Sequence, residues 1–133
     1  MDHNHVRCER HGGHMLWVHR KGAMGLDVGE RGVVPGSMGS ATFHVEGRGH
    51  EASLRSSAHG AGRALSRAEA RRRIGTRTLV RELGGVWFDH RLADGLREEA
   101  PSAYKDIGAV LRAERELVRV VRKLAPVLSF KAM

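Results

Sequence analysis

The middle of the chain carries the stretch Ser57-Ala58-His59-Gly60-Ala61-Gly62-Arg63, in which one histidine stands among small residues. An imidazole is mostly neutral at pH 7, so one ring nitrogen keeps a lone pair that can attack phosphorus. Gly60 and Gly62 have no Cβ, which lets the main chain approach a phosphate closely. The stretch therefore indicates that His59 is a nucleophile. A glycine-rich turn with an incidental histidine is the alternative.

A helix is expected directly after this stretch. Ser66 followed three residues later by Glu69 is a capping-box pattern, and the alanines and arginines that follow are good helix formers. The helix should begin near Arg67. His59 would then lie just before a helix amino terminus, where main-chain N–H groups favour a bound anion.

The rest of the chain predicts an α+β fold of mixed strands, a few short helices and long glycine-rich loops. Strands are expected at 15–19, 41–46 and 86–88. Further helices are expected at 77–83, before a glycine pair, and at 107–115, with Asp106 as the cap. Residues 117–130 fit a helix or a strand, although Pro126 argues against an unbroken helix.

Length and composition point to one domain, 1–133, with a polyanionic partner. The 133 residues include 23 lysines and arginines against 15 acidic residues, which leaves a net charge of +8. This excess favours nucleic acid or nucleotide phosphate as a ligand, with a generally basic surface as the alternative. A single cysteine excludes an intrachain disulfide, and no signal-peptide core or membrane-span-length apolar run is found. We expect a cytoplasmic protein that contacts no membrane.

The chain resembles the carboxy-terminal part of the RtcB family. These are GTP-dependent ligases that join RNA 3′-phosphate or 2′,3′-cyclic phosphate ends to 5′-hydroxyl ends. The resemblance covers nearly the whole chain and about the last third of the family's usual length. It is carried, in family order, by His3-Asn4, Val18-His19-Arg20-Lys21-Gly22-Ala23, Pro35-Gly36-Ser37-Met38-Gly39, the stretch 57–63, Ser66-Arg67, Ala103-Tyr104-Lys105-Asp106-Ile107 and Lys131.

The resemblance implies that His59 attacks the α-phosphate of GTP, releases pyrophosphate and holds GMP as a phosphoramidate. It implies a GMP and GTP site made by His3, Asn4, Pro35, Gly36, Ser37, Met38, Thr42, His59, Gly60, Ala61, Gly62, Tyr104 and Lys131. Thr42 stands where the family commonly has a serine. Lys131 precedes Ala132-Met133, where the family tends to end in Lys-Gly.

The same resemblance implies a metal and phosphate contacts. His3 matches a ligand of Mn²⁺, and Lys21 and Arg67 match residues that hold phosphates of the RNA or the nucleotide. For both basic residues, solvated surface is the alternative. The setting implied is RNA repair or tRNA splicing, with an archease-type protein as a possible helper.

The family's other metal ligands, an aspartate, a cysteine and further histidines, lie upstream of the first matching block. We therefore expect the chain to be a truncated product, or half of a split enzyme whose upstream half is separate. We also expect it to be inactive alone, because metal ions neutralise the triphosphate and orient it for attack.

Two other functions remain open from the sequence. The first is a noncatalytic nucleotide- or RNA-binding remnant, which would keep the glycine loops and basic groups without covalent chemistry at His59. The second is a small zinc site, because closely spaced nitrogen and sulfur ligands can bind zinc tetrahedrally. Its ligands would come from His3, His5, Cys8, His11 and His14.

Overall fold

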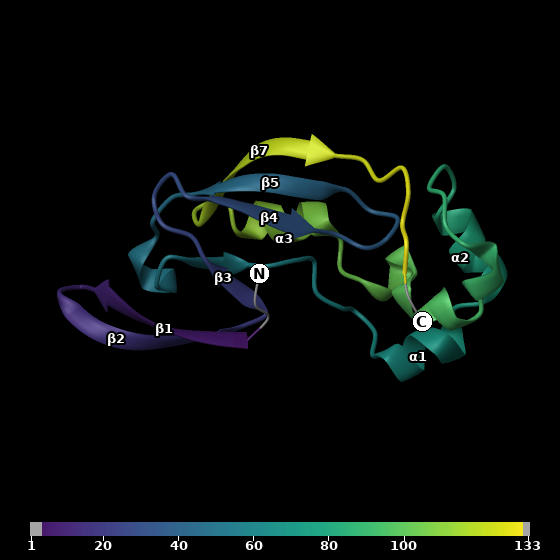
Figure 1. Ribbon diagram of the computed structural model, residues 1–133, viewed down its shortest axis with the longest axis horizontal. Helices are drawn as coiled ribbons and strands as arrows, with labels where there is room; N and C mark the ends of the chain where they lie inside the picture. The colour runs from purple at the N-terminus through teal and green to yellow at the C-terminus, as the bar shows by residue number, and fades with distance from the viewer. Residues whose placement is uncertain (1–3, 132–133) are drawn as a thin grey trace.

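The computed structural model describes residues 4–131 and confirms an α+β fold (Figure 1). The strands are β1 (Asn4–His11), β2 (His14–Lys21), β3 (Ala23–Gly25), β4 (Arg31–Pro35), β5 (Thr42–Gly47), β6 (Ser56–Ala58) and β7 (Val118–Leu124). The helices are α1 (Arg67–Arg73), α2 (Thr76–Glu82) and α3 (Ile107–Ala113). Short 3₁₀ turns are η1 (Glu51–Ser53), η2 (His90–Leu92), η3 (Gly95–Glu99) and η4 (Pro101–Ala103).

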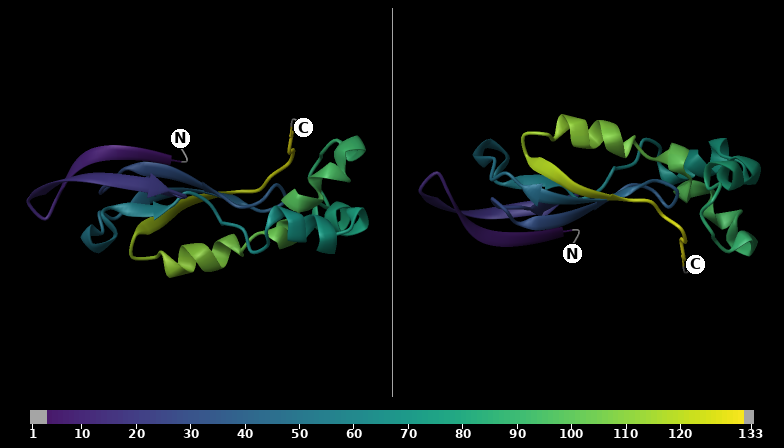
Figure 2. Two further views of the ribbon diagram at one scale, coloured as in Figure 1. Left: turned by 90° about the horizontal axis from the view of Figure 1, so that it is seen from below. Right: turned by 90° about the horizontal axis from the view of Figure 1, so that it is seen from above.

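A three-stranded antiparallel sheet in the order β4-β5-β7 forms the first half of the core. Helix α3 covers one face of this sheet, and the β1–β2 hairpin lies on the opposite side (Figure 2). Val34, Val45 and Val118 point from the three strands into a buried cluster that Ile107 and Leu111 of α3 complete. This packing follows from strand alternation, because every second side chain faces the helix.

The second half of the core is helical. Helices α1 and α2 and the turns after them bury a cluster that includes Ala70, Leu79, Leu83 and Phe88. Met38, from the loop between β4 and β5, also belongs to this cluster. That loop therefore spans the sheet and the helices, and the long segment between β6 and α1 crosses between the same two halves (Figure 1).

The helix predictions are confirmed. The Ser66 hydroxyl accepts a hydrogen bond from the Glu69 N–H at 3.2 Å, as the capping pattern predicts, and α1 begins at Arg67. Helix α2 occupies the second predicted site, and Asp106 caps α3 through the Gly108 N–H at 2.8 Å. None of the helices within residues 4–131 is long and apolar enough to cross a bilayer.

The strand predictions are confirmed at two places and wrong at one. Strand β2 includes the predicted residues 15–19, and β5 includes 42–46 of the predicted 41–46. Residues 86–88 form no strand, because Trp87 makes only an isolated bridge to Leu128. The ambiguous stretch after 117 is a strand, β7, since an open edge of β5 pairs with it. Strand β1 was not predicted.

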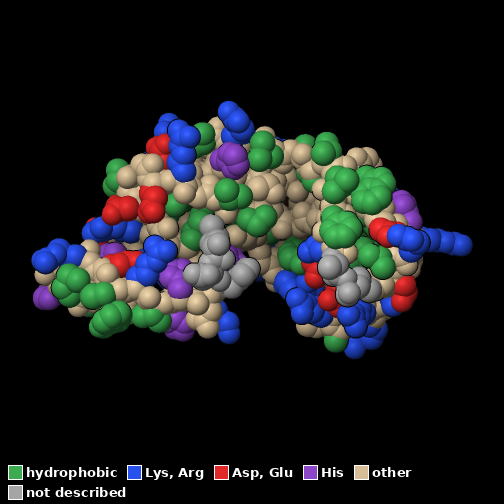
Figure 3. Space-filling view, in the orientation of Figure 1, with side chains coloured by type: hydrophobic (Ala, Val, Ile, Leu, Met, Phe, Trp, Pro, Cys, Tyr) green, Lys and Arg blue, Asp and Glu red, His purple; other side chains and the backbone are tan. Residues whose placement is uncertain are grey.

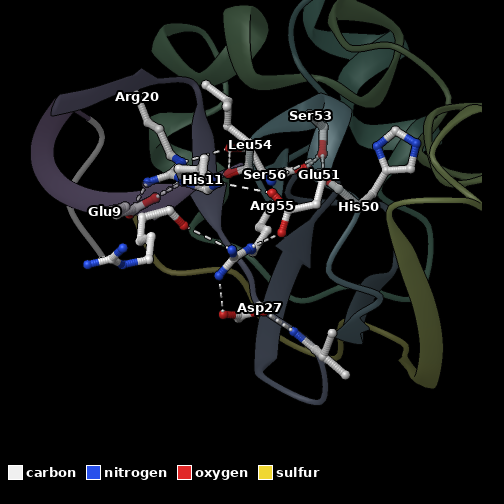
Figure 4. A network of polar contacts seen from close by, with 12 residues as sticks. Glu9, His11, Arg20, Asp27, His50, Glu51, Ser53, Leu54, Arg55 and Ser56 are labelled. Atoms are coloured by element: carbon white, nitrogen blue, oxygen red, sulfur yellow. Dashed lines mark hydrogen bonds and ion pairs between the residues drawn. The ribbon is translucent and has the colours of Figure 1, made fainter. Parts of the chain in front are cut away.

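The buried Arg20 side chain, which is ion-paired to Glu9, fastens the β1–β2 hairpin to the turn before β6 (Figure 4). The Arg20 side chain is 3 % exposed and donates two hydrogen bonds to the Glu9 carboxylate, at 2.7 and 2.8 Å. Arg20 also donates to the Leu54 carbonyl and the Ser56 hydroxyl, both at 2.8 Å. Leu54 has a left-handed backbone with φ of 52°, which an L residue adopts at a cost. Arg20 thus holds a strained turn in place.

The substitution Glu9→Gln should destabilise the chain by about 2 to 4 kcal/mol at pH 6, because it leaves the buried Arg20 guanidinium without a charged partner. The hydrogen bonds from Arg20 hold the pKa of Glu9 at about 2, against a usual value of 4.5. The stabilisation is therefore complete above pH 4.5 and is lost as the pH falls toward 2.

Urea unfolding at pH 6 and at pH 3 measures this effect. The difference in the free energy of unfolding between wild type and Glu9→Gln should be smaller at pH 3. At that pH the ionised Glu9 carboxylate contributes less to stability. Glu116→Gln is the control, since Glu116 is exposed. An equal difference at both pH values would contradict the assignment.

Candidate functional site

The site forms around residues 57–65, to which several predicted blocks are hydrogen-bonded. His59 follows β6 and is half-buried, and its N–H donates to the Gly22 carbonyl at 3.4 Å. The Ala61 N–H donates to the Pro35 carbonyl at 3.0 Å. The residue after Lys21 and the first residue of the predicted nucleotide loop are therefore both bonded to the segment that carries His59.

Hydrogen bonds to residues 40 and 41 fix the loop from Pro35 to Met38. The Gly36 N–H donates to the Ala41 carbonyl at 3.1 Å, and the Ser37 and Ser40 hydroxyls lie 2.7 Å apart. The Met38 side chain is buried among the helices, so this residue can offer a nucleotide only its backbone. Thr42 lies opposite Pro35 in the β4–β5 ladder, which places the predicted hydroxyl contact beside the loop.

The close approach of the Pro35 backbone favours glycine at position 60. A Cβ added to Gly60 would lie 3.3 Å from the Pro35 carbonyl oxygen, which is a tight contact. Gly62 has φ of 73°, in the left-handed region that glycine adopts without strain. The stretch thus needs one glycine for close approach and the other for its backbone turn.

The predicted guanine contacts lie on the carboxy-terminal side of the same stretch. The Lys105 N–H donates to the Gly62 carbonyl at 3.0 Å. The backbones of Arg63 and Tyr104 pair in an isolated antiparallel β-bridge. The Arg63 guanidinium lies 4.9 Å from the Tyr104 ring centre and donates to the Tyr104 hydroxyl at 3.1 Å. Arg63 therefore connects the His59 segment to the predicted base contact.

Glu99 brings the two predicted guanine contacts together. The Tyr104 hydroxyl donates to the Glu99 carboxylate at 2.5 Å, and the Lys131 Nζ lies 3.6 Å from the same oxygen. Burial, and then this hydrogen bond, raise the pKa of Tyr104 to about 12. For Glu99, burial raises the pKa, but the Tyr104 hydrogen bond and the Lys131 and Arg63 charges outweigh it and lower the pKa. Tyr104 is consequently a neutral hydroxyl donor.

The two predicted phosphate residues differ in their surroundings. Lys21 is exposed at the end of β2, opposite Asn4 in the hairpin. Arg67 is 73 % exposed, and its Nε lies 3.6 Å from a Glu98 carboxylate oxygen. A phosphate at Arg67 would share this guanidinium with Glu98.

The predicted metal contacts are only partly described. His3 lies outside the described residues. Its neighbour Asn4, which is predicted to contact GMP, has its side-chain oxygen 2.5 Å from the His19 Nε2. Within residues 4–131 no three His, Cys, Asp or Glu side chains are grouped so as to hold a metal ion. His11, a candidate zinc ligand, is buried with its Nε2 2.9 Å from Glu9.

Sequence reasoning assigned no role to three residues that organise this region. Arg63 was visible as the last residue of the stretch 57–63, and Arg20 as the neighbour of Lys21. Glu99 carries no local signal, because a glutamate near a helix end is usually solvated. Their burial and their hydrogen bonds to distant segments depend on the fold, so no local pattern identifies them.

The surface is hollowed between the sheet end and the helical end of the molecule (Figure 3). Histidine side chains gather on the sheet side of this hollow, and lysine and arginine side chains on the helical side (Figure 3). An anionic ligand between the two ends would meet both groups.

Comparison with known proteins gives the relationship. The family described as tRNA-splicing ligase RtcB matches residues 1–132. The RNA-splicing ligase RtcB of Escherichia coli strain K12 is 40 % identical over 129 residues, which cover 97 % of this chain and 31 % of that protein.

Two further relatives agree with this match. The tRNA-splicing ligase RtcB of Nanoarchaeum equitans is 38 % identical over 109 residues, covering 77 % of this chain and 23 % of that protein. The RNA-splicing ligase RtcB of Mycobacterium tuberculosis is 33 % identical over 147 residues, covering 95 % of this chain and 34 % of that protein.

The chain spans about a third of the length of the E. coli relative. Within that third, the predicted blocks for the nucleophile, the nucleotide loop and the base contacts lie next to one another in the structure. The family match runs through all of these blocks. The chain therefore belongs to the RtcB family.

Proposed function

We propose that this chain supplies the nucleotide-accepting part of an RNA ligase that joins RNA 3′-phosphate or 2′,3′-cyclic phosphate ends to 5′-hydroxyl ends. The observation that carries the proposal is the hydrogen bonding of residues 57–65 to the Gly22, Pro35 and Ala103 carbonyls and to the Lys105 N–H. Three blocks that are far apart in the sequence are thereby bonded to the segment that carries His59.

In the proposed first step, a ring nitrogen of His59 forms a bond to the α-phosphorus of GTP. The bond from that phosphorus to the α,β-bridging oxygen breaks, and pyrophosphate leaves with the electron pair. GMP remains on His59 as a phosphoramidate. The backbone N–H of Ala61 is already used by Pro35, so its role is to hold the loop rather than the phosphate.

In the following steps, an oxygen of the RNA 3′-phosphate attacks the α-phosphorus of this GMP, and the bond to the histidine nitrogen breaks. The 5′-hydroxyl of the second RNA end then attacks the activated 3′-phosphate. It loses its proton and displaces GMP, which leaves a phosphodiester. Lys21 and Arg67 would hold phosphates of the RNA or nucleotide through these exchanges.

Guanine selection is proposed to come from Tyr104 and Lys131. The single hydroxyl proton of Tyr104 is donated to Glu99, so Tyr104 would accept a hydrogen bond from a purine N–H group through its remaining lone pair. Lys131 would donate to a purine carbonyl oxygen or ring nitrogen. Glu99 holds both side chains at one place, with the Tyr104 hydroxyl at 2.5 Å and the Lys131 Nζ at 3.6 Å. Such a fixed pair would select one base, because a wrong base would leave a hydrogen-bonding group unsatisfied.

Dependence on Mn²⁺ is also part of the proposal and rests on the family resemblance of His3. The described residues offer no three-ligand group, so no step above is assigned to the metal. The upstream part of the enzyme, a possible archease-type helper and a cytoplasmic setting in RNA repair or tRNA splicing belong to the same proposal. A noncatalytic binding remnant is the competing function, and covalent labelling of His59 separates the two.

The first test is incubation with α-³²P-GTP and Mn²⁺, on the chain itself and on a chimera in which it replaces the matching third of the E. coli relative. We expect the chimera to take an acid-labile, alkali-stable label, as a phosphoramidate should. His59→Ala should remove the label entirely, because it removes the attacking nitrogen.

His14→Ala is the matched control, since His14 is exposed on the hairpin, and it should label like wild type. A label that persists in His59→Ala would show that the nucleophile is wrong. A folded chimera that binds GTP but takes no label would favour the binding remnant.

The second test is Tyr104→Phe in the same chimera. Phenylalanine keeps the ring beside Arg63 but has no hydroxyl to form a hydrogen bond with guanine, so the preference for GTP over ATP should fall about tenfold. Competitive labelling with the two nucleotides gives this ratio, and the GTP KM should account for the change. An unaltered ratio would remove Tyr104 from the base site.

A further inference from the structure

Strand β6, which ends immediately before His59, is short and has a strand neighbour on only one side. It consists of Ser56, Ser57 and Ala58, and it pairs with β3 in a sheet that contains no third strand among the described residues. Three residues of pairing are little to hold a nucleophile, because an unpaired strand edge exchanges its hydrogen bonds with water.

Side chains supply hydrogen-bond partners to β6 in place of a third strand. The Ser53 hydroxyl accepts a hydrogen bond from the Ser56 N–H at 3.3 Å. The same hydroxyl lies 3.1 Å from the Ser56 carbonyl oxygen. Glu114 is hydrogen-bonded to the last two residues of β6, Ser57 and Ala58. Its carboxylate accepts the Ala58 N–H at 2.9 Å and the Ser57 hydroxyl at 3.1 Å.

We infer that Glu114 is a positioning residue that holds β6, and through it His59, in the orientation for attack. The inference rests on the proposed function of His59. Glu114 contacts β6 through Ser57 and Ala58, and acts on the histidine only through this strand.

The position of Glu114 makes it a firm support. Glu114 is the C-cap of α3, and its carbonyl accepts the Leu117 and Val118 N–H groups at 2.8 and 3.1 Å as the chain turns into β7. Ile107, Leu111 and Val118, on either side of it, are buried in the sheet core. The carboxylate is thus anchored to the main core, whereas β6 alone is not.

The hydrogen bonds between the Glu114 carboxylate and β6 are shielded from water. Each carboxylate oxygen accepts one hydrogen bond, and Ser57 is 3 % exposed, so water competes poorly there. A shift of about 1 Å in a reacting group can lower a rate on the order of 100-fold. Losing this contact should therefore reduce the rate of labelling of His59 more than the binding of GTP.

Geometry and charge can be separated at this position. Glutamine keeps an oxygen for the Ala58 N–H and has an amide that can donate to the Ser57 oxygen, whereas alanine keeps neither. A positioning role predicts that Glu114→Gln stays close to wild type. A general base or a charge effect would instead be lost in Glu114→Gln and would change the pH profile.

The experiment measures amide hydrogen exchange at Ala58 in this chain and His59 labelling in the chimera. We expect Glu114→Ala to speed Ala58 exchange at least tenfold. It should lower the single-turnover labelling rate about 10- to 100-fold, with the GTP KM unchanged within a factor of two. Glu114→Gln should restore both values. Glu116→Ala, which removes the same charge from an exposed residue nearby, should change neither.

Ser57→Ala is the second variant, in case Glu114→Ala does not fold. It removes one of the two contacts and should slow labelling a few-fold. Equal Ala58 exchange in wild type, Glu114→Ala and Ser57→Ala would overturn the inference while leaving the proposed function intact. Loss of labelling in Glu114→Gln would overturn the positioning role in favour of a charge role. A wild-type chimera that takes no label overturns the proposed function, while exchange at Ala58 still tests the support of β6.

Discussion

The hydrogen bonds made by the backbone of residues 59–65 join the two halves of this molecule. Ala61 is buried in the core of the sheet half, and Leu65 packs against the helical core. Between them, the chain is bonded to the Pro35 carbonyl on one side and to the Ala103 carbonyl on the other. His59 therefore lies just before the segment that joins the two halves, and residues 61–65 of that segment contact both cores.

Carboxylates organise much of the basic charge around this loop. The net charge is +8, yet Arg20 is bonded to Glu9, Arg63 lies beside Glu99, and Arg67 and Arg71 share Glu98. A buried or half-buried arginine that is held in this way acts as a structural tie. The exposed Lys21, and Arg67 on its exposed side, are better placed to meet a phosphate. The number of basic residues thus overstates the number available to an anion.

Local signals in the sequence predicted several elements well. The Ser66 and Asp106 caps predicted where two helices begin, because a capping side chain satisfies N–H groups a few residues away. Strand-like length and composition predicted β2 and most of β5. The same reasoning missed β1 and placed a strand at 86–88, because a strand needs a partner that only the fold supplies. Residues 117–130 stayed ambiguous until β5 provided an edge for β7.

The sequence by itself determined the family blocks, the candidate nucleophile His59 and the glycines that its loop requires, since these depend on residue type and short spacing. Only the tertiary structure decided which charged residues serve the site. Arg20, Glu99 and Glu114 resemble ordinary surface residues in the sequence, and each lies 35 or more residues from at least one of the groups that it holds, as Arg20 does from Ser56 and Glu114 from Ala58. Burial and hydrogen bonding between distant segments are properties of the folded chain, so no local pattern encodes them.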